Sequence, residues 1–440
     1  MNNLVYHTLG YHHATQFAEG FSEPDATVGY VTLGKSSVWN ATDDPPTIGD
    51  NDRSVEDVWN AMFGGKKVVG NDVSLVLTRR NWTANTIYTA YDDQANTLFS
   101  TANGQYVYTS AGSVYRCVDN ANNSLSTVEP TGDYSIDHGF IETADGYVWK
   151  YEYAIVPTNK FITTSWIPVP ESQVLAYYGS ANNVVDGAVC RLIVTSGGTG
   201  YSNTNTTITI VGNGVGATAN ATVVGGAIQS CDLLSYGSGY TTQNCSVTVT
   251  GSGTGASIRP VLGPYGGHAY NPAKELGANT VMIAMKIGNP DSTEGGKISA
   301  NNEFRQIALV LGPHKYNEQM SVSSANANAA VLLSTTIVMT TGADFTRDEV
   351  VYQGMDLANA TYRATVTDYF VNDLFVTEQS GTIQIGSVLK GNTSTVTRTV
   401  VNVVAPELES GSGRMVYVEN RAPVSRAIDQ AENIKFVVSF

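Results

Sequence analysis

Charged residues are scarce in this chain of 440 residues, since Asp, Glu, Lys and Arg together make up only 14% of it. So little charge argues against intrinsic disorder, and the hydrophobic share of 42% is that of a folded protein. Basic residues are the scarcer kind, with 24 against 39 acidic ones, which leaves a net charge of −15. Such an acidic chain repels phosphate backbones, so we expect no binding to nucleic acid.

Long apolar runs are also missing. No stretch approaches the roughly 18 to 20 apolar residues that a membrane-spanning helix needs, so we expect no membrane insertion. The first residues, MNNLVYHTLGYHHATQF, have neither a basic start nor a continuous apolar core, and they do not resemble a signal peptide. We therefore expect the chain to fold in a cytoplasm.

Cysteine and histidine are too few and too scattered to form a recognisable site. The four cysteines form no C-x-x-C pair, which favours reduced thiols over a disulfide framework. The adjacent His12 and His13 are expected on a strand, where they would point to opposite faces. The other histidines lack ligand spacing. The cysteines are Cys117, Cys190, Cys231 and Cys245.

Sequence motifs for catalysis and cofactor binding are lacking too. The segment from Asp50 to Ser54 resembles the start of a calcium loop, but Val55 and Ala61 stand where glycine and glutamate are required. The glycine-rich segments have no following Lys-Ser/Thr, and no nucleophile elbow is present. We expect no catalytic residue, no metal, no cofactor and no small-molecule substrate.

What the sequence has in quantity is Gly, Thr, Asn and Val, including 43 glycines. Thr and Val suit pleated strands, while Gly and Asn suit tight turns. The pattern predicts a mainly β protein with packed antiparallel sheets of the β-sandwich type, a few short helices and inserted small β-domains. Expected strands include residues 29–33, 73–77, 106–108, 113–118 and the alternating C-terminal segment that ends at Phe440.

One helix is predicted after residue 54. Ser54 is the expected N-cap, with Asp57 completing a capping box. An apolar stripe at helical spacing begins at Val55 and continues to Phe63. Gly64-Gly65 is expected to end the helix.

The middle of the chain contains an internal duplication. The segment that starts at Gly187 is repeated 39 residues later from Gly226, and each copy contains a glycine-rich turn followed by a tyrosine, Tyr201 or Tyr240. Two copies are too few for a solenoid or a propeller, so we expect one small inserted β-module.

The domain prediction places this module at residues 184–263. A second small module, a barrel or meander of short strands separated by Gly, is expected at 344–406. The parent core domain then comprises residues 1–183, 264–343 and 407–440.

A few basic and aromatic side chains are the candidates for contacts between subunits, because Trp and Arg dominate interface hot spots. These candidates are Arg79, Arg80, Trp82, Arg421 and Arg426. The five tryptophans are otherwise expected to pack in cores and against sheets.

Nine compact motifs occur in one order along the chain and together resemble one family, the dimeric baseplate wedge proteins of T-even-type contractile-tailed bacteriophages. The motifs are Val31–Lys35 with Trp39, Asp43–Pro46, Val55–Gly64, Thr78–Trp82, Val114–Asp119, Asp145–Tyr151, Phe304–Ile307, Tyr417–Pro423, and Ala427–Ile434 with Phe440. The resemblance covers the parent domain and leaves out the duplicated module.

The resemblance implies a structural role without catalysis or cofactor. It implies a homodimer in the tail baseplate of a virion, assembled in the host cytoplasm and gripping other wedge subunits. It implies support for baseplate assembly and for rearrangement on host attachment. Two alternatives stay open: a host-glycan-binding tail protein that presents Tyr201 and Tyr240 to sugars, and a polysaccharide depolymerase with paired carboxylates.

Overall fold

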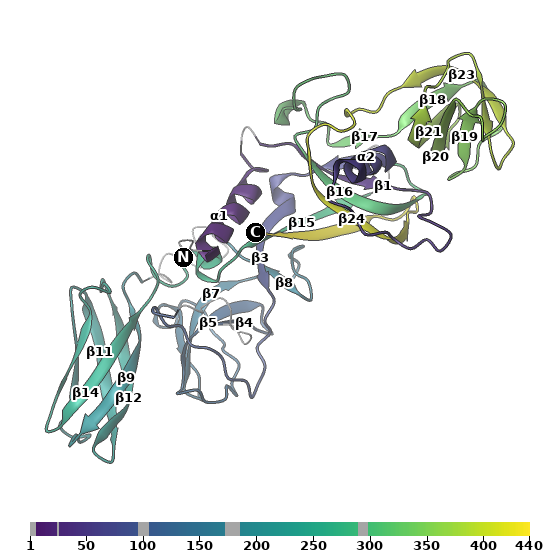
Figure 1. Cartoon of the computed structure of the whole chain (residues 1–440). Helices are drawn as coiled ribbons and strands as arrows, with labels where there is room; N and C mark the ends of the chain where they lie inside the picture. The colour runs from purple at the N-terminus through teal and green to yellow at the C-terminus, as the bar shows by residue number, and fades with distance from the viewer. Residues whose placement is uncertain (1–5, 24–25, 96–104, 172–184, 289–297) are drawn as a thin grey trace. The chain divides into compact units, whose positions relative to one another are not determined.

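The computed structural model describes residues 6–23, 26–95, 105–171, 185–288 and 298–440 (Figure 1). Strands dominate and pair antiparallel in several sheets and one closed barrel, with few helices, so the predicted fold class is confirmed. The chain forms two compact units. Unit 1 contains residues 1–16, 74–282 and 437–440, and unit 2 contains 17–73 and 283–436.

Unit 1 is built around an aromatic sheet in the order β4-β5-β7-β6. Its strands are β4 (Tyr106–Tyr108), β5 (Ser113–Asn120), β6 (Phe140–Glu142) and β7 (Tyr147–Ala154). The core on this sheet is aromatic because Trp149 stacks on Tyr147, with ring centroids 5.5 Å apart, and both are fully buried. Beside it, β3 (Val73–Thr78) pairs with β8 (Trp166–Pro168).

The duplication in unit 1 folds as six strands. The first copy supplies β9 (Val189–Thr199), β10 (Thr207–Val211) and β11 (Val215–Val224), and the second supplies β12 (Ala227–Ser238), β13 (Ser246–Thr250) and β14 (Thr254–Leu262). The copies exchange strands. The first strand of each pairs with the third strand of the other, as β9 with β14 and β12 with β11, while the two middle strands pair together. The two copies therefore fold as one body.

The tyrosines of the two copies are exchanged as well. The ring of Tyr201 lies against Gly253 of the second copy and the ring of Tyr240 against Gly214 of the first, so close that a Cβ on either glycine would stand 2.4 Å from the ring. Tyr201 and Tyr240 are only 8% and 6% exposed. They are core residues of the module, which contradicts the expectation that they face sugars.

Unit 2 contains a five-stranded sheet in the order β17-β2-β1-β16-β24. Its strands are β1 (Gly29–Gly34), β2 (Met62–Lys67), β16 (Glu303–Leu311), β17 (Ala330–Leu332) and β24 (Arg414–Ser425). Helix α2 (Asp52–Ala61) packs on the sheet, because its apolar stripe buries Val58 and Trp59 against Tyr30 and Val310.

A closed six-stranded barrel is the second part of unit 2 (yellow-green in Figure 1). Its strands are β18 (Thr335–Met339), β19 (Val350–Gln353), β20 (Tyr362–Phe370), β21 (Asp373–Gly381), β22 (Val388–Gly391) and β23 (Thr397–Val404). A barrel was one of the two forms expected here. Its first strand begins at Thr335, before the predicted start of this module, and the domain boundaries stay a prediction.

Further elements are two strands with residues in both units and four short helices. Strands β15 (Thr280–Ile287) and β25 (Glu432–Ser439) each begin in one unit and end in the other. The short helices are α3 (Pro272–Glu275), η1 (Gly70–Asp72), η2 (Asp137–Gly139) and η4 (Ser324–Asn326). The last residue is held as expected, because the Phe440 N–H donates to the carbonyl of Asn279 at 2.9 Å.

The N-terminal part of the chain corrects one prediction. His12 and His13 lie on helix α1 (Tyr6–Glu19) and not on a strand. Their neighbours alternate in neither the helical nor the strand period, so the segment gave no clear signal. In the described part of the chain, no helix combines the length and the apolarity required to cross a membrane. All four cysteines are free thiols, as expected.

The ends of α2 correct two more predictions. The N-cap is Asn51, whose Oδ1 accepts from the Ser54 N–H at 3.0 Å, so Ser54 is already inside the helix. The helix ends at Ala61, and Gly64-Gly65 lie within β2. Gly65 is crowded there by Thr32 and Val331 of the neighbouring strands, which explains a glycine in a strand without any role in ending the helix.

Candidate functional site

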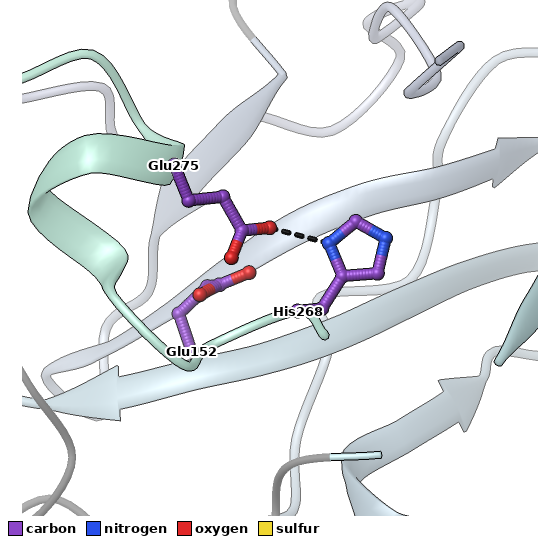
Figure 2. Close-up of side chains that lie close together, drawn as sticks. All are labelled: Glu152, His268 and Glu275. Atoms are coloured by element: carbon purple, nitrogen blue, oxygen red, sulfur yellow. Dashed lines mark hydrogen bonds and ion pairs between the residues drawn. The ribbon is translucent and has the colours of Figure 1, made fainter. Parts of the chain in front are cut away.

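A buried cluster of ionisable side chains in unit 1 is the strongest candidate site. Figure 2 shows Glu152, His268 and Glu275 pointing toward one another. Glu152 belongs to β7, Glu275 ends α3, and His268 lies in the loop between β14 and α3. Their potential ligand atoms all lie within 4.8 Å of one another, and all three residues are buried.

Glu275 is the centre of the hydrogen-bonding network. Its Oε2 accepts from the Ala269 N–H at 2.7 Å, and its Oε1 contacts Nδ1 of His268 and Nη1 of Arg116, the latter at 3.0 Å. The local fold places it there, since Asn271 caps α3 by accepting from the Lys274 N–H at 2.8 Å. Glu275 thereby joins the loop that precedes α3 to the aromatic sheet.

Two cations from the aromatic sheet complete the cluster. Arg116 of β5 donates to the carbonyl of Glu275 at 2.9 Å and to Oε1 of Gln105 at 2.7 Å, and its guanidinium lies 4.5 Å from the ring centroid of Tyr91. Lys150 of β7 donates from Nζ to the carbonyl of His138 at 2.6 Å. Both cations are 1% exposed.

The surroundings separate the pKa values of the two carboxyl groups. Burial alone would raise the pKa of Glu275, but His268, Arg116 and the Ala269 N–H outweigh it and lower that pKa to about 2. Burial raises the pKa of Glu152 well above its ordinary value, and the nearby Glu275 raises it further. At neutral pH Glu275 is therefore ionised, whereas burial and the Glu275 charge both disfavour the ionised form of Glu152.

The basic groups of the cluster respond to the same burial. It lowers the pKa of Lys150 to about 8, against the attraction of Glu152 and Glu275. It also lowers the pKa of His268, so that the imidazole is neutral at pH 7. The neutral imidazole of His268 can donate a hydrogen bond from Nδ1 to the ionised Glu275 without carrying a charge itself.

Two carboxylates and one imidazole are ligands that several transition metals accept. The arrangement nevertheless favours an ion-pair network. The Oε1 and Oε2 atoms of Glu275 already accept hydrogen bonds, and Arg116 and Lys150 supply the positive charge that a metal ion would bring. The cluster fastens the segment after the duplicated module to the aromatic sheet.

Sequence reasoning missed this cluster, although a signal was present. Arg116, Lys150 and Glu152 stand inside strands that otherwise consist of buried apolar and aromatic residues. A charge in such a run indicates burial with a partner, because charged side chains are almost never fully buried alone. The partners His268 and Glu275 lie more than a hundred residues away, and nothing local points to them.

The candidate interface residues of unit 1 form one neighbourhood after β3. Arg79 donates to the carbonyl of Thr163 at 3.0 Å, and its guanidinium lies 4.9 Å from the Tyr108 ring centroid. Arg80 lies 5.6 Å from the Tyr106 ring centroid. Trp82 donates from Nε1 to Ser126 at 3.1 Å. All three remain partly exposed, and their role between subunits stays a prediction.

The two candidates of unit 2 differ from each other. Arg421 is 40% exposed in its side chain, and its guanidinium lies 3.8 Å from Glu419. Arg426 is 1% exposed in its side chain and donates to Glu432 at 3.0 Å and to the carbonyl of Gly288 at 2.9 Å. The guanidinium of Arg426 is therefore used inside the chain, and burial leaves it unable to reach another subunit.

Several motifs that carry the family resemblance meet in unit 2. Arg305 donates from Nε to both carboxylate oxygens of Asp43, at 2.8 and 2.9 Å, and the same carboxylate accepts from the Trp39 N–H at 3.0 Å. Trp39 donates from Nε1 to the carbonyl of Arg421 at 3.1 Å. Asn420 donates to the carbonyl of Pro46 at 3.0 Å. Segments far apart in sequence are thus joined by one polar network.

Part of the chain matches a known protein family. The family model described as "Bacteriophage T4, Gp8" matches residues 13–138 of this chain. That range contains β1, α2 and β2 to β5, together with Trp39, Asp43 and Arg116. Glu152, His268 and Glu275 lie outside it.

A curated relative is the baseplate wedge protein gp8 of Enterobacteria phage T4, which is 26% identical over 186 residues. The alignment covers 33% of this chain and 55% of the relative. The chain thus spans about half the length of the curated relative it matches. The resemblance to T-even-type baseplate wedge proteins, which we predicted from the motifs, is confirmed.

The cluster predicts unequal effects for two matched substitutions. Glu275→Gln removes an ionised group from Arg116 and should lower the free energy of unfolding by about 3 to 5 kcal/mol. Glu152→Gln replaces a carboxyl whose charge is disfavoured by burial with a neutral amide of similar shape, and should cost no more than about 1 kcal/mol. Urea denaturation of the full chain, followed by tryptophan fluorescence, measures both. Equal losses would contradict the assignment of the charge to Glu275.

The lowered pKa of Glu275 also predicts a pH dependence. Its folded pKa of about 2 lies below the ordinary 4.5, so its stabilisation is complete above pH 4.5 and is lost as the pH falls toward 2. The stability advantage of the wild type over Glu275→Gln should shrink by about 3 kcal/mol over this range. Urea denaturation at several pH values tests this. A difference that does not change with pH would refute it.

Proposed function

We propose that this chain is a structural subunit of the baseplate wedge in a contractile-tailed phage virion. In this role it docks neighbouring wedge subunits and supports baseplate assembly in the host cytoplasm. The observation that carries the proposal is the family match over residues 13–138, which falls on folded core elements of both units. The polar network of Trp39, Asp43 and Arg305 supports it, because it joins motifs of the resemblance inside and outside the matched range.

The proposed role is not enzymatic. The curated relative is a baseplate wedge protein. The buried carboxyl groups Glu152 and Glu275 are 0% and 8% exposed, and of the two only Glu275 lines a pocket. The pair does not present two carboxyl groups to one cleft, as polysaccharide cleavage requires, which disfavours the depolymerase alternative.

The glycan-binding alternative loses its original support. It relied on Tyr201 and Tyr240 as exposed platforms, and both rings are packed against glycines of the exchanged repeat. A sugar cannot stack on a ring that is already covered. The duplicated module therefore enters the proposal as a folded insertion of the wedge subunit, without an assigned ligand.

Rearrangement on host attachment is part of the proposal, and the joint between the barrel and the rest of unit 2 supports it. Lys35 forms an ion pair with Glu378 of the barrel strand β21, and Ser37 donates to the same carboxylate at 2.9 Å. Lys35 and Glu378 both have positive φ, 58° and 51°. Left-handed backbone costs on the order of 1 to 2 kcal/mol at each residue. Both residues of this joint are therefore strained in the backbone.

We also propose a homodimer, with Arg421 as the best-placed interface candidate. Its side chain is 40% exposed, and its guanidinium lies 3.8 Å from Glu419. A carboxylate or carbonyl of a second subunit would pair with the exposed part of this guanidinium. Several such contacts acting together within a ring of wedges make modest interfaces strong.

Electron cryomicroscopy of intact tails, extended and contracted, tests the baseplate role. We expect density for this chain in each wedge, in two copies, with the barrel displaced relative to the rest of unit 2 after contraction. Absence of the chain from the baseplate would refute the proposal as a whole. Identical contacts in both states would refute only the rearrangement.

The homodimer is tested in solution by sedimentation of the purified chain. Arg421→Glu should raise the dimer dissociation constant about tenfold or more, because it reverses the charge at the proposed contact. Arg53→Glu is a matched control, since Arg53 lies on α2 with 79% exposure and pairs only with Asp57 in the same helix. A strictly monomeric wild type, or equal effects of the two variants, would contradict the interface.

A further inference from the structure

A pocket of about 410 Å³ in unit 1 borders the buried cluster. Arg116 and Glu275 line it from the cluster, and Tyr91, Tyr265, Tyr270 and Lys274 contribute aromatic and basic side chains. Its lining is mainly apolar with a few polar groups, and its volume lies in the range of small-molecule sites.

Two tyrosines at the pocket are held in the open. Tyr265 is 96% exposed and Tyr270 is 56% exposed. The Tyr270 ring lies against Gly266, where a Cβ would stand 2.6 Å from it, so this close contact requires a glycine. Neither hydroxyl makes a hydrogen bond with any of the described residues, whereas the hydroxyl of the buried Tyr240 accepts from the Ala217 N–H at 3.4 Å.

The loop that carries these tyrosines is strained and fastened by the cluster. Ala269 has a φ of 65°, which an alanine rarely adopts, and its N–H is held by the Glu275 carboxylate at 2.7 Å. The strained Ala269 thus links the loop that contains Tyr265 and Tyr270 to the ion-pair network. Fixing this loop in advance reduces the entropy that a ligand would lose on binding.

The pocket also contains positive charge that the protein does not neutralise. Lys274 is exposed and forms no ion pair with any carboxylate in the described ranges, in a chain with 39 acidic residues. A ligand that brings a negative group would pair with this ammonium group.

We infer that this pocket binds an acidic sugar, a pyranose ring with a carboxylate. The apolar face of such a ring stacks on an exposed tyrosine, its hydroxyls pair with the free tyrosine hydroxyls, and its carboxylate pairs with Lys274. Acidic sugars are constituents of many cell-surface polysaccharides, so the site would contact the surface of a host. It is a site separate from the docking role proposed above.

Ligand-observed NMR on the purified full chain at pH 7 tests the inference, with glucuronic acid, glucose and acetate as probes. We expect glucuronic acid to bind about tenfold more tightly than glucose, because only the former meets Lys274, and acetate not to bind measurably. Tyr265→Ala should weaken both sugars about tenfold through loss of stacking. Lys274→Gln should reduce glucuronic acid to the level of glucose.

Tyr316→Ala is the matched control, since Tyr316 is an exposed tyrosine of unit 2 with 52% exposure. It should leave the affinity for glucuronic acid unchanged. Acetate binding as tight as glucuronic acid would reveal an anion site without sugar recognition and overturn the inference. So would absence of sugar binding up to about 50 mM. Neither result bears on the baseplate role, which is tested in intact tails.

Discussion

Much of unit 1 depends on the contacts made by one group, the ionised carboxylate of Glu275. It lies at the end of a one-turn helix and reaches Arg116 on the aromatic sheet, His268 in the preceding loop and the N–H of the strained Ala269. Because a buried charge is costly unless it is paired, all these partners must be in place together. The position of the loop after the duplicated module, and of the pocket above it, follows from this one anion.

The second polar network, in unit 2, has the opposite character. Asp43 is partly exposed, and Arg305 lowers its pKa through two hydrogen bonds. The network ties loops to the edge of the five-stranded sheet, next to the joint at which Lys35 meets the barrel. Unit 1 thus uses a fully buried network to fix a loop, whereas unit 2 has a more accessible one beside a joint proposed to move.

Local patterns predicted much of this fold. The strands near Val31, Leu75 and Tyr115 alternate or are continuously apolar, and the helix stripe around Val58 is clear, so these elements are found where the sequence indicates them. The repeat was visible because its glycines and tyrosines recur at a fixed distance. The N-cap of α2 was misplaced by three residues, since Asn51 and Ser54 are both good caps and only the observed backbone decides between them.

Long-range pairings could not be predicted in the same way. Nothing near Glu275 indicates Arg116, and nothing near Tyr201 indicates Gly253, because the contact in each case depends on how the sheets close. Arg426 shows the same limit. Its residue type suggested an interface, because Arg is frequent in hot spots, but its side chain is buried and pairs with Glu432. The sequence can indicate that a buried charge needs a partner. It does not readily indicate which residue that partner is.

The exchange of strands between the two repeats has a consequence for how the chain is made. As β9 leaves the ribosome its partner β14 has not yet been synthesised, and β11 must wait for β12. One repeat alone would expose open strand edges, which invite pairing with other chains. The smallest piece that can be gained or lost without leaving such edges is therefore the pair, so we expect natural variants of this chain to differ by two copies at a time.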